Sequence, residues 1–432
     1  MLYDAYQAFS DATDPVRELA SNTQRILSAW NDGVFANPFQ RMAAYYELVA
    51  LAGFTHRRPP FDIHEVKVGD QVVSITEEVI AKTPFGSLLR FRKDGVEGDP
   101  KVLLIAPMSG HFATLLRGTV LTMLRDHDVY ITDWHNARDV PLREGNFSLD
   151  DYTRHIIDFI HAIGPETHVV AVCQPTVSAL AATAIMAQNR DNDQPASLTL
   201  MAGPIDTRVS PTKVNDLANE KPYEWFEKKM IGVVPMGLPG AGRRVYPGFL
   251  QLVAFMSMNI ERHSKSFVDL FKHRIAGDFE KANAIRTFYE EYFAIMDLPG
   301  DFYLDTIKHV FQDCALPQGK LMYEGRLVEP RAIKKTFLLT VEGERDDICA
   351  VGQTLVAQDL CSGLRPYMKS HHMQPGVGHY GVFNGRRWET QIYPSCATIS
   401  GRASSASIKD RIHRQRPASR PLFPSATRRI AP

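Results

Sequence analysis

Residues 168–189 read HVVAVCQPTVSALAATAIMAQN. The first five form a short apolar run that is typical of a buried strand, and the segment from Thr176 onward has the composition of a helix. Between the strand and the helix there is room only for a very short turn, which holds Cys173. A junction of this kind is the geometry of a nucleophile elbow, in which a sharp turn lifts one side chain above the sheet. Cys173 is therefore the first candidate for a reactive group.

The neighbours of Cys173 are compatible with such a turn. Strand and helix pass close together at an elbow, so its flanks must be small, and here they are Ala171 and Pro175. Proline is tolerated because the first helical turn does not need its missing N–H. A thiol at a helix N-terminus also lies at the positive end of the dipole, which stabilises the reactive thiolate. The alternative is a buried cysteine that serves only as a small hydrophobic residue.

Strand and helix patterns alternate on both sides of this junction. Apolar runs occupy 102–108, 129–133, 198–202, 336–341 and 367–371, and helical patterns occupy 113–125, 149–163 and 352–363. This alternation predicts an α/β protein with a mostly parallel, doubly wound sheet covered on both faces. The short alternating runs in residues 61–95 predict antiparallel strands at one edge of that sheet.

Five segments are expected along the chain. They are an N-terminal helical extension (1–60), a first part of the α/β core (61–208), a helical cap insertion (209–330), a second part of the core (331–395) and a basic tail (396–432). The insertion is rich in Met, Phe, Tyr and Trp, which fits either the core of a cap or a surface that contacts an apolar polymer. The tail lacks any helical or strand period, which predicts disorder, with a basic anchor as the alternative.

Composition restricts the kind of protein. The 432 residues include 49 Lys+Arg and 49 Asp+Glu, and this balance argues against nucleic-acid binding, which requires a basic surface. Five cysteines are too few for a disulfide scaffold and predict a reducing, cytoplasmic location. The first residues do not resemble a secretory signal, and no apolar stretch is long enough to predict a transmembrane segment.

Acidic residues and a histidine follow the last two predicted strands. Glu342, Glu344, Asp346 and Asp347 come after the strand at 336–341, and His379 lies in a glycine-rich loop after the strand at 367–371. The carboxyl ends of parallel strands meet at one edge of a sheet, where reactive groups gather. The order nucleophile, acid, histidine is the one expected for the α/β-hydrolase fold, so a triad of Cys173, one of these acids and His379 is predicted.

Acyl transfer also requires donors for an oxyanion. The backbone N–H of Gln174 is one candidate, and Ser109 or Gly110, in the loop after the strand at 102–108, could supply a second. No metal site is predicted, because the cysteines lack paired spacing. The four cysteines other than Cys173 have no comparable setting, and we expect them to be structural: Cys314, Cys349, Cys361 and Cys396.

Four stretches of the chain resemble the intracellular poly(3-hydroxybutyrate) depolymerases, which are relatives of the polyhydroxyalkanoate synthases in the α/β-hydrolase superfamily. They are AVCQPTVSALAATAIMA (171–187), VYITDWHNARDVP (129–141), EGERDDI (342–348) and PGVGHYGVFNGRRW (375–388). The resemblance implies that Cys173, Asp346 and His379 are catalytic. It favours Asp346 over Asp347 because the family's aspartate precedes the Asp-Ile pair of this loop.

The resemblance also implies a substrate and a location. It predicts hydrolysis of poly(3-hydroxybutyrate) in cytoplasmic granules through an acyl thioester, with the polymer or granule surface as partner. No cofactor is implied, although coenzyme A could accept the acyl group; the oligomeric state is left open. The alternatives are a synthase-like acyltransferase, for which glycine would be expected in place of Pro175, and a non-catalytic granule-associated protein.

The end of the chain departs from the resemblance. The family's last helix should continue past Tyr393 and Pro394, whereas the sequence from about residue 395 has no helical period. One hypothesis is that the reading frame shifts near residue 395, which would make the terminus non-native. A comparison of the other two frames of the coding DNA would test it.

Overall fold

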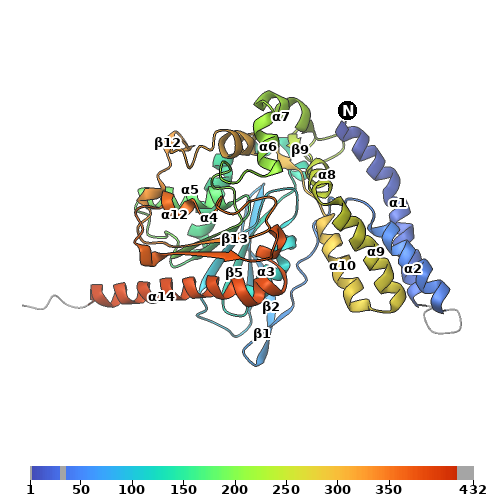
Figure 1. Ribbon diagram of the computed structural model, residues 1–432, viewed down its shortest axis with the longest axis horizontal. Helices are drawn as coiled ribbons and strands as arrows, with labels where there is room; N and C mark the ends of the chain where they lie inside the picture. Colours follow the sequence, from blue (N-terminus) through green and yellow to red (C-terminus); the bar gives the residue numbers. More distant parts are fainter. Residues whose placement is uncertain (1, 30–35, 416–432) are drawn as a thin grey trace, which may run out of the picture.

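A nine-stranded sheet forms the centre of the computed structural model, which describes residues 2–29 and 36–415 (Figure 1). The strand order is β1-β2-β3-β5-β4-β6-β7-β13-β14. The strands are β1 (Glu65–Val68), β2 (Gln71–Lys82), β3 (Gly86–Lys93), β4 (Lys101–Ile105), β5 (Asp128–Trp134), β6 (His168–Val172), β7 (Ser197–Met201), β13 (Phe337–Gly343) and β14 (Lys369–Gln374).

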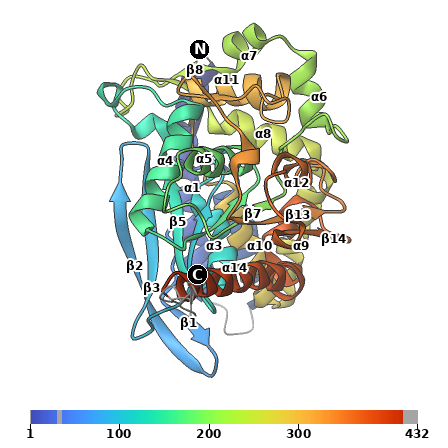
Figure 2. The ribbon, with the colours of Figure 1, turned by 90° about the vertical axis from the view of Figure 1, so that its left-hand side faces the viewer.

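The pairing of these strands identifies the fold. β1, β2, β3 and β5 pair antiparallel, and the antiparallel β1–β3 ribbon lies at one edge (Figure 2). From β5 to β14 every pair is parallel. Every residue of β6, β7 and β13 is buried, as expected for parallel strands covered on both faces. This strand order, with the predicted elbow after β6, is the α/β-hydrolase fold, and the predicted fold class is confirmed.

Helices cover both faces of the sheet. α4 (Leu149–Ile163) and α5 (Thr176–Gln188) lie on one face, whereas α3 (Arg117–Met123) and α14 (Tyr393–Gln415) lie on the other (Figure 1). To one side, α1 (Leu2–Ala29) and α2 (Ala36–Leu51) pack with a second helical pair. That pair is formed by α9 (Ile260–Ala276) and α10 (Phe279–Tyr292).

A long helical excursion separates β7 from β13. In addition to α9 and α10 it contains α6 (Lys213–Glu220), α7 (Tyr223–Met230), β8 (Gly232–Val233), β9 (Arg244–Tyr246), α8 (Gly248–Met258), β10 (Leu298–Pro299), α11 (Gly300–Asp305), β11 (Met322–Tyr323) and β12 (Arg326–Leu327). Buried Asp297 ties this excursion to the N-terminal helix. Its Oδ1 accepts a hydrogen bond from the N–H of Gly248 at 2.8 Å, and its Oδ2 accepts one from the hydroxyl of Tyr3.

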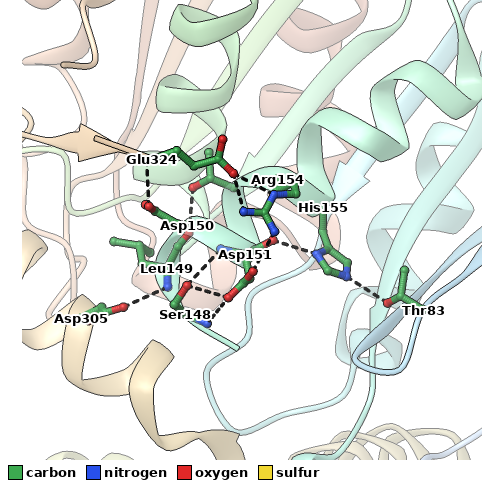
Figure 3. Close-up of polar contacts among 10 residues, drawn as sticks. Thr83, Ser148, Leu149, Asp150, Asp151, Arg154, His155, Asp305 and Glu324 are labelled. Carbon is green, nitrogen blue, oxygen red and sulfur yellow. Dashed lines mark hydrogen bonds and ion pairs between the residues drawn. The ribbon is translucent and has the colours of Figure 1, made fainter. Parts of the chain in front are cut away.

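The first turn of α4 joins the same excursion to the core (Figure 3). Ser148 and Asp151 form a capping box, in which Ser148 Oγ accepts from the N–H of Asp151 and Asp151 Oδ2 accepts from the N–H of Ser148. Asp305 of α11 accepts a further hydrogen bond from the N–H of Leu149 at 3.2 Å. The first backbone N–H groups of α4 have no partner within the helix, and the excursion supplies one of their acceptors. This hydrogen bond helps to fix the position of the excursion over the sheet.

The helix predicted for 352–363 is wrong. This segment consists mainly of turns, with a single helical turn, α12 (Ala357–Leu360). The cause is buried Glu342, whose carboxylate accepts hydrogen bonds from the N–H groups of Gly352, Thr354 and Leu355 at 2.8–2.9 Å. These bonds hold the segment in a shape set by a tertiary contact rather than by its own helical propensity.

The disordered tail predicted from residue 396 is also wrong over residues 396–415. α14 continues through this segment to Gln415 and buries Cys396, Ile399 and Ala403 against the sheet. In addition, Ser400 Oγ lies 3.0 Å from Nε2 of buried His127. The frame-shift hypothesis concerns the coding DNA and stays a prediction. The rest of the predicted tail, residues 416–432, lies outside the described residues.

Over residues 2–29 and 36–415, none of the helices has both the length and the apolar character that crossing a membrane requires.

Candidate active site

Cys173 occupies a strained turn between β6 and α5. Its φ is +66°, in the left-handed region that non-glycine residues rarely adopt. Three hydrogen bonds hold the turn: the N–H of Cys173 donates to Met201 O at 2.8 Å, and the N–H and hydroxyl of Thr176 both donate to Cys173 O. Such strain persists only where the surroundings enforce it, and it is concentrated at functional sites. The turn is the elbow geometry expected from the sequence.

Gly203, just after β7, lies close to the side chain of Thr176 at this turn. A Cβ placed on Gly203 would lie 1.9 Å from Oγ1 of Thr176, far inside van der Waals contact. Thr176 cannot turn aside freely, because its hydroxyl is bonded to the carbonyl of Cys173 at 2.8 Å. A glycine in the neighbouring strand loop is therefore needed for the elbow to close.

The change Gly203→Ala is expected to lower the free energy of unfolding by about 1–3 kcal/mol through overpacking. Urea unfolding followed by circular dichroism measures this difference. Gly401→Ala is the matched control, because Gly401 is exposed in α14 and its Cβ would meet no atom within 4 Å. The control should be neutral or stabilising by up to about 1 kcal/mol. Equal stability of the two variants would contradict the close approach at the elbow.

His379 and Asp346 form a buried pair beside the elbow. His379 Nδ1 lies 2.8 Å from Asp346 Oδ2, and Asp346 Oδ1 accepts hydrogen bonds from the N–H groups of Ile348 and Cys349, both at 2.9 Å. Asp347 points elsewhere and accepts a hydrogen bond from Asn259 Nδ2 at 2.9 Å. Of the four acids considered from sequence, Asp346 is the one that contacts the imidazole; Glu344 accepts a hydrogen bond from Gly376 N.

Cys349 completes a cluster that the sequence did not reveal. The sulfur atoms of Cys173 and Cys349 and a ring nitrogen of His379 all lie within 4.8 Å of one another. Since Nδ1 is bound to Asp346, the nitrogen that faces the two sulfurs is Nε2. Cys349 was expected to be a structural cysteine, and the one hint in the sequence is its position three residues after Asp346.

These three side chains are also of the types that bind zinc. Among the described residues a second group of three candidate metal ligands, His161, Asp191 and Asp193, includes an exposed histidine. In the first group, two of the three atoms belong to the elbow thiol and its neighbouring imidazole. A metal ion there would occupy the reactive sulfur instead of activating it.

The environment of Cys173 favours its thiolate. A hydrogen bond from Cys349 outweighs the effect of burial and, together with the positive charge and hydrogen bond of His379, lowers the pKa of Cys173 to about 5. Burial opposes a charge on His379, but the charges of Asp346 and Cys173 and hydrogen bonds to both raise its pKa well above the usual range. The pKa of Cys349 is raised, first by its hydrogen bond to Cys173. Both shifts favour a thiolate on Cys173 and a protonated imidazole on His379.

The loops predicted to supply an oxyanion hole lie next to the thiol. Ser109 and Gln174 line the same cavity as Cys173. Gln174 Oε1 accepts a hydrogen bond from the N–H of Met108 at 3.3 Å, which links the two loops. Gly110 has a φ of +95°, and its carbonyl accepts a hydrogen bond from Met296 N at 2.9 Å, so the excursion braces this loop.

The thiol opens into an apolar cavity of about 480 Å³. Side chains of the excursion form most of its wall: Phe226, Tyr246, Phe255, Met258, Phe302, Tyr303 and Phe311. Another aromatic residue of the predicted cap, Phe249, is not part of this wall. It is buried and stacks on Tyr6 of α1, with ring centroids 4.1 Å apart. The aromatic content of the insertion thus serves both a core and the wall of a cavity beside Cys173.

Residues 202–403, just under half of the chain, match the family model described as the PHB de-polymerase C-terminus. The matched segment includes Asp346, Cys349 and His379 but not Cys173. No curated protein sequence matches the chain. The match shows a PHB depolymerase domain, and with the fold described above it makes the chain an ester hydrolase.

Several solved structures are similar in fold. A soluble variant of the monoglyceride lipase from Saccharomyces cerevisiae has 10% identity and a TM-score of 0.45, covering 80% of this chain and 99% of its own. A meta-cleavage product hydrolase from Pseudomonas fluorescens has 15% identity and a TM-score of 0.37, covering 80% and 97%. A hydrolase from Pseudomonas aeruginosa has 13% identity and a TM-score of 0.39, covering 77% and 98%. The strand order and the elbow, not these distant similarities, establish the fold.

Proposed function

We propose that the chain hydrolyses poly(3-hydroxybutyrate) through an acyl thioester on Cys173. The observation that carries this proposal is the meeting of three features at one point. A strained cysteine stands beside a His379–Asp346 pair joined at 2.8 Å, in a cavity whose wall is apolar. The PHB depolymerase domain contributes the acid and the imidazole, and the elbow of the preceding core contributes the nucleophile.

The first half of the reaction forms the thioester. The Cys173 sulfur attacks an ester carbonyl, and backbone N–H groups of the Gln174 turn and the Ser109–Gly110 loop receive the oxyanion. His379, protonated at Nε2, donates that proton to the departing alkoxide of the polymer chain. Asp346 keeps the imidazole in the tautomer and orientation that this transfer requires.

The second half releases the acyl group. His379, now neutral, accepts a proton from water as the water attacks the thioester, and the 3-hydroxy acid departs as Cys173 regains its thiolate. A thioester can equally pass its acyl group to another thiol, so coenzyme A is the alternative acceptor. Assays with and without coenzyme A, with the products separated by mass spectrometry, distinguish the free acid from the acyl-CoA.

The apolar wall of the cavity favours a polyester over a polar substrate. Its wall is largely aromatic and aliphatic, so ester units with methyl side groups can replace water there at little polar cost. We place the chain in the cytoplasm at the surface of polymer granules, where its free thiols would stay reduced.

Release of 3-hydroxybutyrate units from amorphous granules by the purified chain is the test of the proposal. A matched pair of variants sharpens it: Phe255→Ala in the cavity wall should weaken polymer hydrolysis more than hydrolysis of a small soluble ester. Val268→Ala, on the exposed face of α9, should affect neither substrate. Hydrolysis of the small ester without any release from granules would overturn the polymer assignment.

The rate of acylation is expected to depend on pH through the Cys173–His379 pair. Because the pKa of Cys173 is lowered to about 5, the thiolate forms as pH rises through that value, and kcat/KM should rise there. The change Cys349→Ala removes the largest cause of the lowered pKa, so this acid limb should move to higher pH. Profiles of kcat/KM on a soluble ester measure both values.

The control for that profile is Cys361→Ala, which removes another buried cysteine that is not part of the group formed by Cys173, Cys349 and His379. Its acid limb should stay where the unmodified chain has it. An acid limb that is the same in Cys349→Ala as in the unmodified chain would show that the second thiol does not tune the nucleophile.

A further inference from the structure

Two thiols of unequal accessibility meet at the site. Both cysteines line the cavity, but Cys173 is half-buried whereas Cys349 is almost fully buried. Their sulfur atoms lie within 4.8 Å of each other and of His379. Cys173 is therefore the more accessible of the two thiols to a small oxidant, and the second thiol is close enough to react with it next.

The mechanism of ester hydrolysis does not consume this second thiol. The other described cysteines are situated differently: the sulfur of Cys314 lies 3.4 Å from the hydroxyl of Thr207, and Cys361 and Cys396 are packed in the main hydrophobic core. Cys349 is thus a nucleophilic group adjacent to a reactive one, with an imidazole in reach of both sulfurs. This arrangement has the parts of a peroxidatic and a resolving cysteine.

We propose that Cys173 and Cys349 form a site of reversible covalent modification, at which a hydroperoxide oxidises Cys173 and Cys349 then closes a disulfide with it. The modification needs only the two thiols, the imidazole and access to the cavity. It therefore does not depend on which ester the chain hydrolyses.

The two steps balance with hydrogen peroxide as oxidant. The Cys173 thiolate attacks one peroxide oxygen, the O–O bond breaks, and the departing hydroxide takes a proton from His379 to give water and a sulfenic acid. His379 then accepts the proton of Cys349, whose sulfur attacks the Cys173 sulfur. The S–O bond breaks, and the hydroxide takes that proton to give a second water. Two thiols and one peroxide thus yield one disulfide and two waters.

The two sulfurs start close together. They lie at most 4.8 Å apart and must approach to about 2.05 Å for the bond to form. The backbone of Cys349 is anchored, because its N–H donates to Asp346 at 2.9 Å. The disulfide would remove the nucleophile and at the same time prevent its further oxidation to the sulfinic acid, which thiol reductants do not reverse.

Mass spectrometry of the full chain tests the proposal. Reduced protein is exposed to a small excess of hydrogen peroxide, its remaining thiols are blocked, and it is then digested. We expect a loss of two hydrogens from the intact mass, a peptide pair linking Cys173 to Cys349, and recovery of nearly all thiol reactivity after dithiothreitol. Oxidation of Cys173 to the sulfinic acid without a linked peptide would overturn the proposal.

Two variants make the result specific. In Cys349→Ser no linked peptide should form, and peroxide should leave Cys173 as a sulfinic acid that dithiothreitol does not restore. Cys361→Ser should behave as the unmodified chain does. A disulfide between Cys173 and any cysteine other than Cys349 would also overturn the proposal. If Cys349→Ser does not fold, peptide mapping of the unmodified chain still shows whether the Cys173–Cys349 disulfide forms. Because the disulfide is detected by mass, the result does not depend on whether the chain hydrolyses polyester.

Discussion

Replacing Cys173 by alanine is expected to reduce hydrolysis of amorphous poly(3-hydroxybutyrate) by about 10⁴- to 10⁶-fold, since loss of a nucleophile removes the covalent route altogether. The cavity, the His379–Asp346 pair and the oxyanion donors stay in place, so substrate should still bind. Release of 3-hydroxybutyrate units from granules, measured at matched protein concentrations, gives the rate. Circular dichroism and urea unfolding should show a stability close to that of the unmodified chain.

Cys173→Ser is the informative companion to this variant. A serine hydroxyl lacks the low pKa of the thiol, so it would depend on His379 as a general base in a site that is built around a thiolate. We expect a residual rate above that of alanine but well below that of the unmodified chain. Near-full hydrolysis of granules by either variant would refute Cys173 as the nucleophile.

Asp346→Asn is expected to lower kcat by about 10⁴-fold, as misorientation of a triad histidine does elsewhere. Asp346 Oδ1 already accepts hydrogen bonds from Ile348 N and Cys349 N, so the amide oxygen of asparagine would occupy that place. Its NH₂ group would then face His379 Nδ1, which would have to accept a hydrogen bond. The imidazole proton would move to Nε2, and a neutral ring in that tautomer cannot accept a proton from water.

Asp347→Asn is the matched control, because the neighbouring carboxylate makes its hydrogen bond to Asn259 rather than to the imidazole. Its kcat should remain within a few-fold of the unmodified chain. Steady-state kinetics on a soluble ester measure both variants. A large loss in Asp347→Asn with a small loss in Asp346→Asn would reverse the assignment of the acid.

The parts of the molecule that follow from local sequence were predictable. Strands such as 169–172 are continuous apolar runs, and helices such as α4 carry their own capping residues. The spacing of apolar residues and the capping residues at helix ends were therefore enough to predict these elements. Cys173, His379 and a cluster of acids that includes Asp346 could be expected to lie together because each follows a parallel strand, whereas the choice of Asp346 within that cluster came from the family resemblance. The carboxyl ends of those strands share one edge of the sheet, and topology therefore carries residues distant in sequence to one place.

The features that sequence missed depend on contacts between distant segments. Cys349 lies in a turn whose shape is set by Asp346, and nothing in its neighbours indicates that it touches another cysteine. Glu342 captures three backbone N–H groups and prevents the helix expected at 352–363. In α14, Cys396, Ile399 and Ala403 recur at helical spacing and are buried, but this stripe holds few large apolar residues and is interrupted by polar ones, so it was missed.

The long excursion between β7 and β13 has a consequence for biosynthesis. Cys173 leaves the ribosome 206 residues before His379, which at about 5–20 residues per second corresponds to roughly 10–40 s of translation. Throughout that interval the nascent polypeptide carries its sulfur without the imidazole that would activate it. The proposed triad can therefore be complete only after β13 and β14 have been synthesised.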